Sequence, residues 1–205
     1  EAFPFLASRE VSVAGIAARV HRVSFTGDLG YEVHISIADH GRLYDALLEA
    51  GEDLGAVDVG ARAMDSLRLE KGWGRMGAEF TRDTMPFEVG LGRFVKMDKA
   101  DFIGRDALLQ AQEAGIRYQL VLLDIDADDA DAWANEPVYQ ADTIVGSVTS
   151  GGFGHTVGKS IALALIEPGL AQTGTMLQVD ILGQRRPATV SMEALFDPTG
   201  ARLRS

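Results

Sequence analysis

The strictest pattern in this chain is the alternation of apolar and polar side chains over residues 31–37. A period of two residues is typical of a half-buried strand, in which successive side chains point to opposite faces of a sheet. The residues just before it, 26–30, are Thr-Gly-Asp-Leu-Gly and predict a turn, because several of them tolerate a positive φ. One face of the predicted strand comprises Tyr31, Val33, Ile35 and Ile37, and the other comprises Glu32, His34 and Ser36.

The carboxylate of Glu32 therefore stands at the start of a predicted strand, opposite the apolar face. A carboxylate that is fixed by a sheet can accept hydrogen bonds with both oxygens from a flat donor pair, such as an N–H beside an NH2 group. The alternative is a solvated glutamate on an exposed face, because glutamate is mostly exposed in proteins. The pattern alone leaves both interpretations open.

Charge and composition exclude several classes of function. The net charge of −11 argues against a nucleic acid or an anionic membrane as partner, whereas a small anionic molecule stays compatible if basic residues converge. No apolar run approaches the roughly 20 residues that span a bilayer. The absence of cysteine excludes disulfides, zinc–thiolate sites and a cysteine nucleophile, and it fits a reducing compartment, so we predict a cytoplasmic protein. Because the sequence begins Glu-Ala-Phe-Pro, without methionine, we expect a piece of a longer protein.

Further elements are predicted before residue 60. Apolar residues between 11 and 23 suggest two strands that turn near Gly15. Asp39 is a predicted N-cap for a helix that places Leu43 and Leu47 on one face and ends near Gly51. A short loop, with a strand as the alternative, is expected over residues 53–59.

A helix bracketed by glycines is predicted within residues 60–74. Arg62 falls in its first turn, where the helix dipole disfavours a cation, and this suggests that Arg62 has another anion to hold. The alternative is an exposed arginine whose aliphatic stem covers apolar neighbours. Further along the same helix, Arg68 and Glu70 are interpreted as structural residues.

The middle of the chain is less regular. Residues 81–95 are expected to be irregular and then extended, with a break at Pro86. Residues 101–105 predict the end of a strand that turns at Gly104 into a helix, which ends at Gly115. The aspartate-rich stretch 124–131 lacks the glycine at the sixth loop position and the closing glutamate of an EF-hand, so we interpret it as a solvated loop.

Short β-rich runs dominate from Tyr118 onward and predict a small β-barrel or sandwich. The glycine-rich residues 151–154 lack the Lys-Ser/Thr ending of a phosphate-binding loop and are interpreted as a turn. We place a domain boundary near residues 115–118, where the composition changes. The predicted strands lie at residues 118–125, 143–149, 160–166, 176–182 and 187–192.

Four segments coincide in a fixed order: residues 25–32 (Phe-Thr-Gly-Asp-Leu-Gly-Tyr-Glu), 61–70 (Ala-Arg-Ala-Met-Asp-Ser-Leu-Arg-Leu-Glu), 101–105 (Asp-Phe-Ile-Gly-Arg) and 148–152 (Val-Thr-Ser-Gly-Gly). Together they resemble the tetrahydrofolate-binding aminomethyltransferase family, which comprises the T-protein of the glycine cleavage system and its relatives. The resemblance covers nearly the whole chain. Residues 3–5, 71–74 and 99–102 are more similar to the C-terminal part of dimethylglycine and sarcosine dehydrogenases, in which this module follows a flavin-binding oxidase domain.

The resemblance implies an α+β fold: the C-terminal half of a folate-binding aminomethyltransferase domain at residues 1–116, followed by a small antiparallel β-barrel at 117–205. It implies tetrahydrofolate as cofactor, with FAD in the part of a parent protein that precedes this chain. Glu32 matches the family's glutamate that hydrogen-bonds the pterin ring, and Arg62 matches an arginine that contacts the folate. Tyr31 is adjacent to this cofactor-binding pair, and packing is its alternative role.

No aspartate here matches the family's catalytic aspartate, which lies in the N-terminal half of the folate domain. The resemblance therefore assigns no catalytic residue to this chain, and we expect the chain alone to be inactive. The implied reaction is transfer of a one-carbon group from a methylated amine, or from an iminium made by a flavin, to tetrahydrofolate. The implied partners are small molecules, together with a flavin domain or a lipoyl protein, and neither nucleic acid nor membrane.

Three readings remain open. The chain can be the folate-binding portion of an amine-demethylating flavoenzyme, a dimethylglycine or sarcosine dehydrogenase-like protein. It can be a piece of a stand-alone aminomethyltransferase that handles an aminomethyl group carried on a lipoyl protein. A third reading is a folate-fold protein with another task, either a non-enzymatic one such as iron–sulfur cluster maintenance, or removal of a methyl group from a sulfonium substrate.

Overall fold

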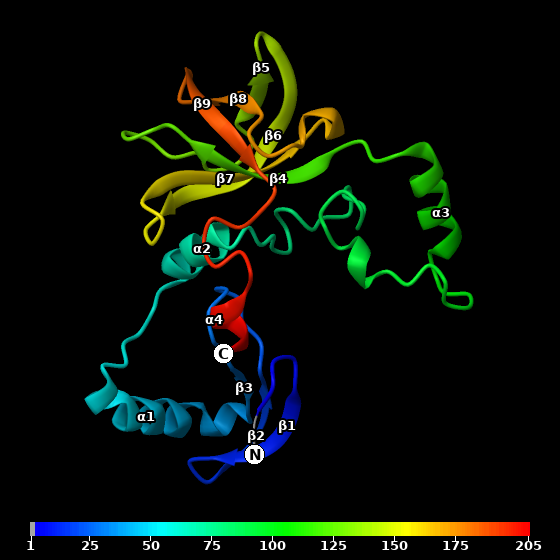
Figure 1. Cartoon of the computed structure of the whole chain (residues 1–205). Helices are drawn as coiled ribbons and strands as arrows, with labels where there is room; N and C mark the ends of the chain where they lie inside the picture. The colour runs from blue at the N-terminus through cyan, green and yellow to red at the C-terminus, as the bar shows by residue number, and fades with distance from the viewer. Residues whose placement is uncertain (1–2) are drawn as a thin grey trace. The chain divides into compact units, whose positions relative to one another are not determined.

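The computed structural model describes residues 3–205 and divides into two compact units (Figure 1). The sheet unit comprises the described part of residues 1–65 together with residues 199–205. The barrel unit comprises residues 66–198. Within the described residues no helix is long and apolar enough to cross a membrane, and no group of acidic and histidine side chains is arranged to hold a metal ion.

The sheet unit contains three antiparallel strands in the order β1-β2-β3. β1 (Ser8–Val13) and β2 (Ile16–His21) form the predicted strand pair, and they turn at Gly15, whose φ is +76°. The side chains of β2 alternate between buried and exposed, as expected for a half-buried strand. β3 (Glu32–His34) pairs with the C-terminal half of β2.

The strand predicted over residues 31–37 is shorter in the structure than its alternation suggested. Only β3 is a strand, and the chain then enters a 3-10 helix, η1 (Ile37–Asp39), which Ser36 caps by accepting a hydrogen bond from the N–H of Ala38 at 3.4 Å. Tyr31 and Ile37 are exposed at 48% and 86%, so the apolar face of this segment is limited to its middle residues. The alternation predicted which residues share a face, but not that the chain leaves β2 after His34, although β2 continues beyond Arg19 to Ile16.

α1 (His40–Gly51) follows, and the 3-10 helix η2 (Glu52–Leu54) extends it. Its end agrees with the predicted one, and Asp39 occupies the predicted N-cap position. Its side chain makes no cap hydrogen bond, however, and its Oδ1 accepts a hydrogen bond from Arg42 Nη1 at 2.8 Å. Leu43 is buried whereas Leu47 is 50% exposed, so the apolar face of α1 is only partly covered.

α2 (Ala61–Glu70) lies where the glycine-bracketed pattern predicted a helix. Arg68 and Glu70 are almost completely buried near its end, in agreement with their interpretation as structural residues. Oε1 of Glu70 accepts hydrogen bonds from the backbone N–H groups of Thr156 and, at 3.1 Å, of Val157. The helix end thereby fixes the turn at the tip of a barrel hairpin.

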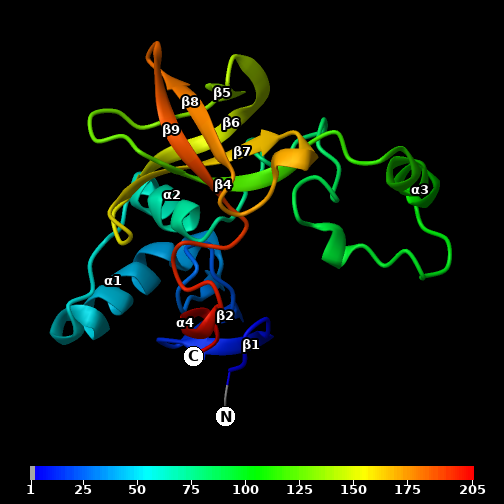
Figure 2. The ribbon, with the colours of Figure 1, turned by 45° about the horizontal axis from the view of Figure 1, so that its top comes forward.

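The barrel unit contains a closed barrel in the order β4-β7-β6-β5-β8-β9, in which every adjacent pair is antiparallel (Figure 2). This confirms the barrel and excludes the sandwich alternative. Its interior is filled by aliphatic side chains, among them Leu123, Val138, Ile166 and Val179, which are completely buried. The strands are β4 (Gln119–Ile125), β5 (Pro137–Gln140), β6 (Thr143–Gly154), β7 (Lys159–Ile166), β8 (Met176–Ile181) and β9 (Gln184–Ser191).

Two features of the barrel differ from the sequence prediction. The glycine-rich residues 151–154 belong to strand β6 and are not a turn, and β5 was not predicted. A Cβ on Gly151 would lie 2.5 Å from the carbonyl oxygen of Ala132, so the glycine is needed for close approach of two backbones. Gly151 is therefore required because two chain segments lie close together there, and not because the chain changes direction.

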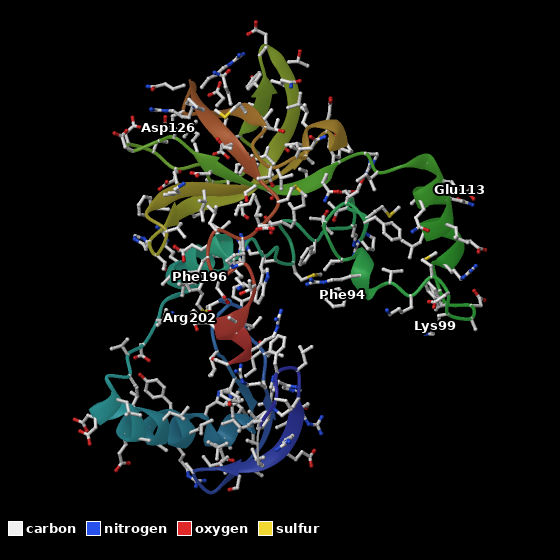
Figure 3. The ribbon with its side chains drawn as sticks, in the orientation of Figure 1. Phe94, Lys99, Glu113, Asp126, Phe196 and Arg202 are labelled. Atoms are coloured by element: carbon white, nitrogen blue, oxygen red, sulfur yellow. The ribbon has the colours of Figure 1, made fainter. Side chains whose placement is uncertain are left out.

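Residues 71–118 connect α2 to the barrel with little regular structure. They contain the 3-10 helix η3 (Gly92–Phe94) and α3 (Arg105–Ala114), which begins after Gly104 and ends at Gly115 as predicted. The strand end predicted before Gly104 is wrong, because residues 95–104 form no strand. Figure 3 shows the segment between Phe94 and Glu113, with Lys99 at an outer bend. The remaining short elements are η4 (Pro168–Leu170) and α4 (Ala201–Arg204).

Candidate functional site

Polar side chains cover one face of the three-stranded sheet, which we call the polar face. Residues that oppose each other directly in an antiparallel pair share a face, so the strand register assigns the members of this one. The opposite face carries the buried residues of β2. Two rows cross the polar face: Ser8, His21 and Glu32 form one, and Glu10, Arg19 and His34 form the other.

Glu32 lies beside His34 on this face. Oε2 of Glu32 is 3.6 Å from Nε2 of His34, and the two side chains are 58% and 61% exposed. The ring of His34 makes an edge-on contact with that of His21, with a centroid distance of 4.9 Å and an interplanar angle of 86°. Glu32, the residue predicted to bind the cofactor, therefore belongs to a small group of polar side chains that a bound molecule can reach.

The turn before Glu32 is fixed by hydrogen bonds at both ends. The N–H of Gly27 donates to Oγ of Ser24 at 3.0 Å, and Asp28 accepts two hydrogen bonds from Arg202, from Nη2 at 2.9 Å and Nε at 3.2 Å. A Cβ on Gly30 would lie 2.8 Å from the carbonyl oxygen of Val23, which makes this glycine necessary for the turn. The start of β3 is thus held by its own loop and by α4.

Arg22 supports the same turn from beneath. It is only 2% exposed, and it donates hydrogen bonds to the carbonyl oxygens of Gly30 at 3.3 Å and Ser205 at 2.8 Å. Its guanidinium also lies 5.1 Å from the centre of the Tyr31 ring, within the range of a cation–π contact. Arg22 therefore contacts the two residues that immediately precede Glu32.

The structure gives the predicted site residues different surroundings. Tyr31 is half-exposed, and its ring meets Phe3 edge-on at 5.6 Å in addition to its contact with Arg22, which indicates packing. Glu32 projects from the polar face. Arg62 lies in a separate element, exposed in the first turn of α2, as the sequence predicted.

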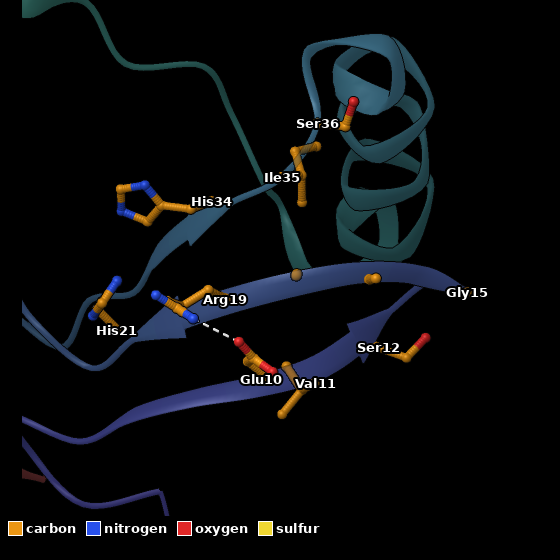
Figure 4. Close-up of a pocket in the computed structure, with 11 residues that line it drawn as sticks. Glu10, Val11, Ser12, Gly15, Arg19, His21, His34, Ile35 and Ser36 are labelled. Carbon is orange, nitrogen blue, oxygen red and sulfur yellow. Dashed lines mark hydrogen bonds and ion pairs between the residues drawn. The ribbon is translucent and has the colours of Figure 1, made fainter.

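An open cavity of about 1070 Å³ lies over the polar face (Figure 4). Its lining includes Glu10, Arg19, His21, His34 and Ser36. Arg19 and Glu10 form an ion pair across β1 and β2, drawn as a dashed line in Figure 4, so this end of the cavity is charge-balanced. The histidines lie at the end of the face that Glu32 occupies.

A second open cavity of about 920 Å³ lies on the barrel beside the aspartate-rich loop, which contains Asp126 (Figure 3). Its charged side chains are largely paired: Asp124 with Lys159, and Asp129 with Arg186. This pairing fits the interpretation of residues 124–131 as a solvated loop.

Two groups outside the polar face have displaced pKa values. The hydroxyl of Tyr44 donates a hydrogen bond to Asp58 at 2.7 Å, which raises the pKa of Tyr44. Burial of Glu88 would raise its pKa, but the backbone N–H groups of Met85 and Arg117 and the Arg117 guanidinium outweigh burial, so the pKa is lowered. Contacts within the fold therefore explain both pKa shifts.

Sequence reasoning did not assign a role to His34, His21 or Arg22. A signal for His34 was present, because it is two residues after Glu32 and so shares its face of the strand. The position of His21 depends on the strand register, and that of Arg22 depends on the path of the turn. Neither is readable from local periodicity.

Comparison with known proteins gives two family matches and several relatives. Residues 1–99 match the GCVT N-terminal domain, and residues 119–197 match the glycine cleavage T-protein C-terminal barrel domain. Mitochondrial dimethylglycine dehydrogenase from Mus musculus is 38% identical over 99% of this chain and 24% of its own length. An aminomethyltransferase from Caldanaerobacter subterraneus subsp. tengcongensis is 38% identical over 88% of this chain and 48% of its own length.

A solved structure agrees with these matches. The crystal structure of glycine cleavage system aminomethyltransferase T from Bartonella henselae aligns with a TM-score of 0.86 and 26% identity, over 96% of this chain and 54% of that chain. This chain thus spans about a quarter of the dimethylglycine dehydrogenase and about half of the aminomethyltransferases that it matches.

Proposed function

The chain belongs to the glycine cleavage T-protein family, and we propose that it supplies part of the folate-binding site of a one-carbon transfer enzyme. The names of the relatives, dimethylglycine dehydrogenase and aminomethyltransferase, support a reaction on a methylated or aminomethylated amine. The relatives are longer than this chain, so the complete activity, its substrate and its partners belong to the proposal.

The observation that carries the proposal is the carboxylate of Glu32 at the start of β3. A pterin ring presents an N–H group beside an NH2 group, and a carboxylate can accept one hydrogen bond from each. The Glu32 side chain is 58% exposed on the polar face, so a ligand can approach it. The residues beside it fit a pterin, because imidazole rings and an arginine can pack against a flat heterocycle.

The two other residues that were predicted to bind the cofactor, Arg62 and Tyr31, have more limited roles in this proposal. Arg62 contacts the folate from the first turn of α2, where its positive charge suits an anionic group of the ligand. Tyr31 acts by packing, since its ring already contacts both Phe3 and Arg22. No described residue is assigned as the catalytic acid or base.

Tetrahydrofolate supplies the nitrogen nucleophile that accepts the one-carbon group. The residues of this chain bind and orient it: Glu32 aligns the ring through its donor edge, and Arg22 keeps the preceding turn in place. Orientation of this kind lowers the barrier because the reacting groups need not find each other in solution.

The flavoenzyme is preferred as the parent protein. The dimethylglycine dehydrogenase match covers 99% of this chain, whereas the aminomethyltransferase match covers 88%. The proposal thus includes FAD in a separate domain that oxidises the amine. A stand-alone aminomethyltransferase with a lipoyl protein partner is the second candidate. The predicted cytoplasmic location stays a prediction, since the dehydrogenase relatives from mouse and human are named as mitochondrial proteins.

A calorimetric titration of the full-length protein with tetrahydrofolate, at fixed pH and salt, tests this proposal. Glu32→Gln should weaken binding roughly 10- to 100-fold, because one pterin donor would then face an NH2 group. Glu32→Asp should also bind poorly, because the shorter side chain withdraws the carboxylate. Glu49→Gln is the matched control: it removes an exposed carboxylate from α1, away from the polar face, and should bind as the wild type does. Wild-type affinity in Glu32→Gln would refute the assignment.

A further inference from the structure

One end of the barrel holds two buried polar atoms that have no partner among the described residues. We call it the barrel mouth; it is the end at which β4 stops and β7 and β9 begin. The two atoms are Oγ of Ser160 and Nε of Arg186. Buried polar side-chain atoms in proteins are nearly always hydrogen-bonded, so this pair indicates donors for a bound molecule.

The strand register places both side chains on the inner side of the barrel wall. Residues that oppose each other directly in an antiparallel pair share a face of the sheet. Ser160 opposes Ile125 of β4, and Arg186 opposes Val179 of β8, and both of these apolar partners belong to the buried core. Ser160 itself is only 1% exposed. The two polar side chains therefore reach the same end of the core from different strands.

The cavity of about 920 Å³ on the barrel opens at this mouth. Its lining contains both Ser160 and Arg186, and Ile125 and Phe153 supply apolar surface beside them. Arg186 is held in place by Asp129, which accepts a hydrogen bond from Nη2 at 2.8 Å and leaves Nε unused. The cavity thus offers two fixed donors, a hydroxyl and one edge of a guanidinium, next to an apolar wall.

The charges of the lining restrict what such a molecule carries. A guanidinium edge beside a hydroxyl suits a carboxylate. Two exposed aspartates of the same lining, Asp126 and Asp128, make no side-chain hydrogen bond or ion pair within residues 3–205. They would repel a simple anion and attract an ammonium group. The other cations of the lining are already paired, Lys159 with Asp124 and Arg185 with Asp142.

We propose that the barrel mouth binds a small zwitterionic amino acid. Its carboxylate accepts hydrogen bonds from Oγ of Ser160 and Nε of Arg186, its ammonium group faces the two unpaired aspartates, and its carbon atoms contact the apolar wall. A carboxylate or an amine alone satisfies only half of these groups. All the residues involved belong to the barrel unit, so the proposal does not depend on the folate site.

Calorimetric titration of the full-length protein with glycine, acetate and methylamine at pH 7 tests the ligand class. Glycine carries both charges, whereas acetate and methylamine carry one each. Glycine should bind with a roughly millimolar dissociation constant, as suits a ligand of about five non-hydrogen atoms. Each of the other two should bind at least about tenfold more weakly. No heat of glycine binding would mean that the buried atoms hold only water, and acetate or methylamine binding as tightly as glycine would exclude a zwitterion; either result overturns the proposal.

Ser160→Ala separates binding from folding. It removes only a hydroxyl, on the face of β7 that already carries Ala162, so the protein should be as stable as the wild type or more stable, because a buried polar atom without a partner is lost. Glycine affinity should nevertheless fall roughly tenfold, since the carboxylate loses a donor. Urea unfolding and the glycine titration measure the two effects. Ser147→Ala, at an exposed serine of β6, is the matched control and should bind glycine as the wild type does.

Arg186→Lys tests the second donor. Lysine keeps the positive charge beside Asp129 but has no counterpart of Nε, so glycine binding should again weaken roughly tenfold. If the wild type binds glycine and both Ser160→Ala and Arg186→Lys bind it equally well, glycine occupies another site and the assignment to the barrel mouth is wrong.

Discussion

The guanidinium of Arg22 lies 5.1 Å from the centre of the Tyr31 ring. The same buried side chain donates a hydrogen bond to the carbonyl oxygen of Gly30, so one cation contacts two consecutive residues of the turn. Glu32 follows directly. Its position is therefore set by Arg22, which directly follows β2 and need not touch the ligand.

Replacing Arg22 should loosen this turn. Arg22→Met retains most of the apolar stem but leaves the Gly30 carbonyl without its donor, which costs about 1–3 kcal/mol of unfolding free energy. Folate affinity should fall as well, because Glu32 loses its fixed position. The measurements are urea unfolding and the folate titration. Arg42→Met, which removes an exposed arginine from α1, is the control and should change stability by less than about 0.5 kcal/mol. Equal unfolding midpoints in the two variants would contradict this role.

The sequence predicted the elements whose signals are local. The turn at Gly15, the helix after Gly60 and most barrel strands follow from periodicity and glycine placement. The end of β3 was not predictable in this way, because β2 continues past Arg19 to Ile16 and the strand ends where the chain turns into η1, which Ser36 caps. The close approach at Gly151 depends on Ala132, from a distant part of the sequence, so the glycine was mistaken for a turn residue.

In the candidate site, too, the sequence predicted the features that have a local signal and missed those that depend on distant residues. The face on which Glu32 lies was readable from the alternation of residues 31–37. Its contact with His34 was implied by that alternation, but the ring contact with His21 required the register of β2 and β3. Buried charges such as Glu79, which accepts hydrogen bonds from Thr149 at 2.7 Å and from Ser150, could not be foreseen because their partners are about seventy positions away.

Glu88 should make stability depend on pH. Its pKa is lowered in the folded state, so its contribution is present above the ordinary glutamate value, near 4.3, and is lost as pH falls through the folded pKa. Glu88→Gln should therefore destabilise the protein at pH 7 and flatten the loss of stability below about pH 5. Urea unfolding between pH 3 and 7 measures both effects. Glu113→Gln, on the exposed face of α3, serves as control. If Glu88→Gln loses as much stability between about pH 5 and pH 3 as the wild type does, Glu88 is not the cause of the pH dependence.

The predicted domain boundary can be tested by dissection. Residues 117–205 contain all strands of the closed barrel and its apolar core, so they should unfold cooperatively on their own. Residues 66–205 should be more stable, because they add Glu79, whose carboxylate accepts hydrogen bonds from β6. Residues 1–116 should not fold stably alone, since the exposed apolar side chains of their sheet unit include Ile37 and Leu54. Amide exchange on the separate pieces measures this, and a protected N-terminal piece beside a disordered barrel would refute the boundary.

The barrel should be most sensitive to added volume where β6 meets β7. A Cβ on Gly146 would lie 2.2 Å from the Leu165 carbonyl oxygen and 2.8 Å from Cα of Ile166, and backbone atoms cannot rotate away as side chains can. Gly146→Ala should therefore lower the free energy of unfolding by about 1–3 kcal/mol, the usual cost of overpacking. Gly169→Ala is the matched control, because a Cβ there meets nothing within 4 Å, and it should be neutral or stabilising by up to about 1 kcal/mol. Urea unfolding of both variants decides the point: if Gly146→Ala is as stable as Gly169→Ala, the two strands are not packed as closely as this distance requires.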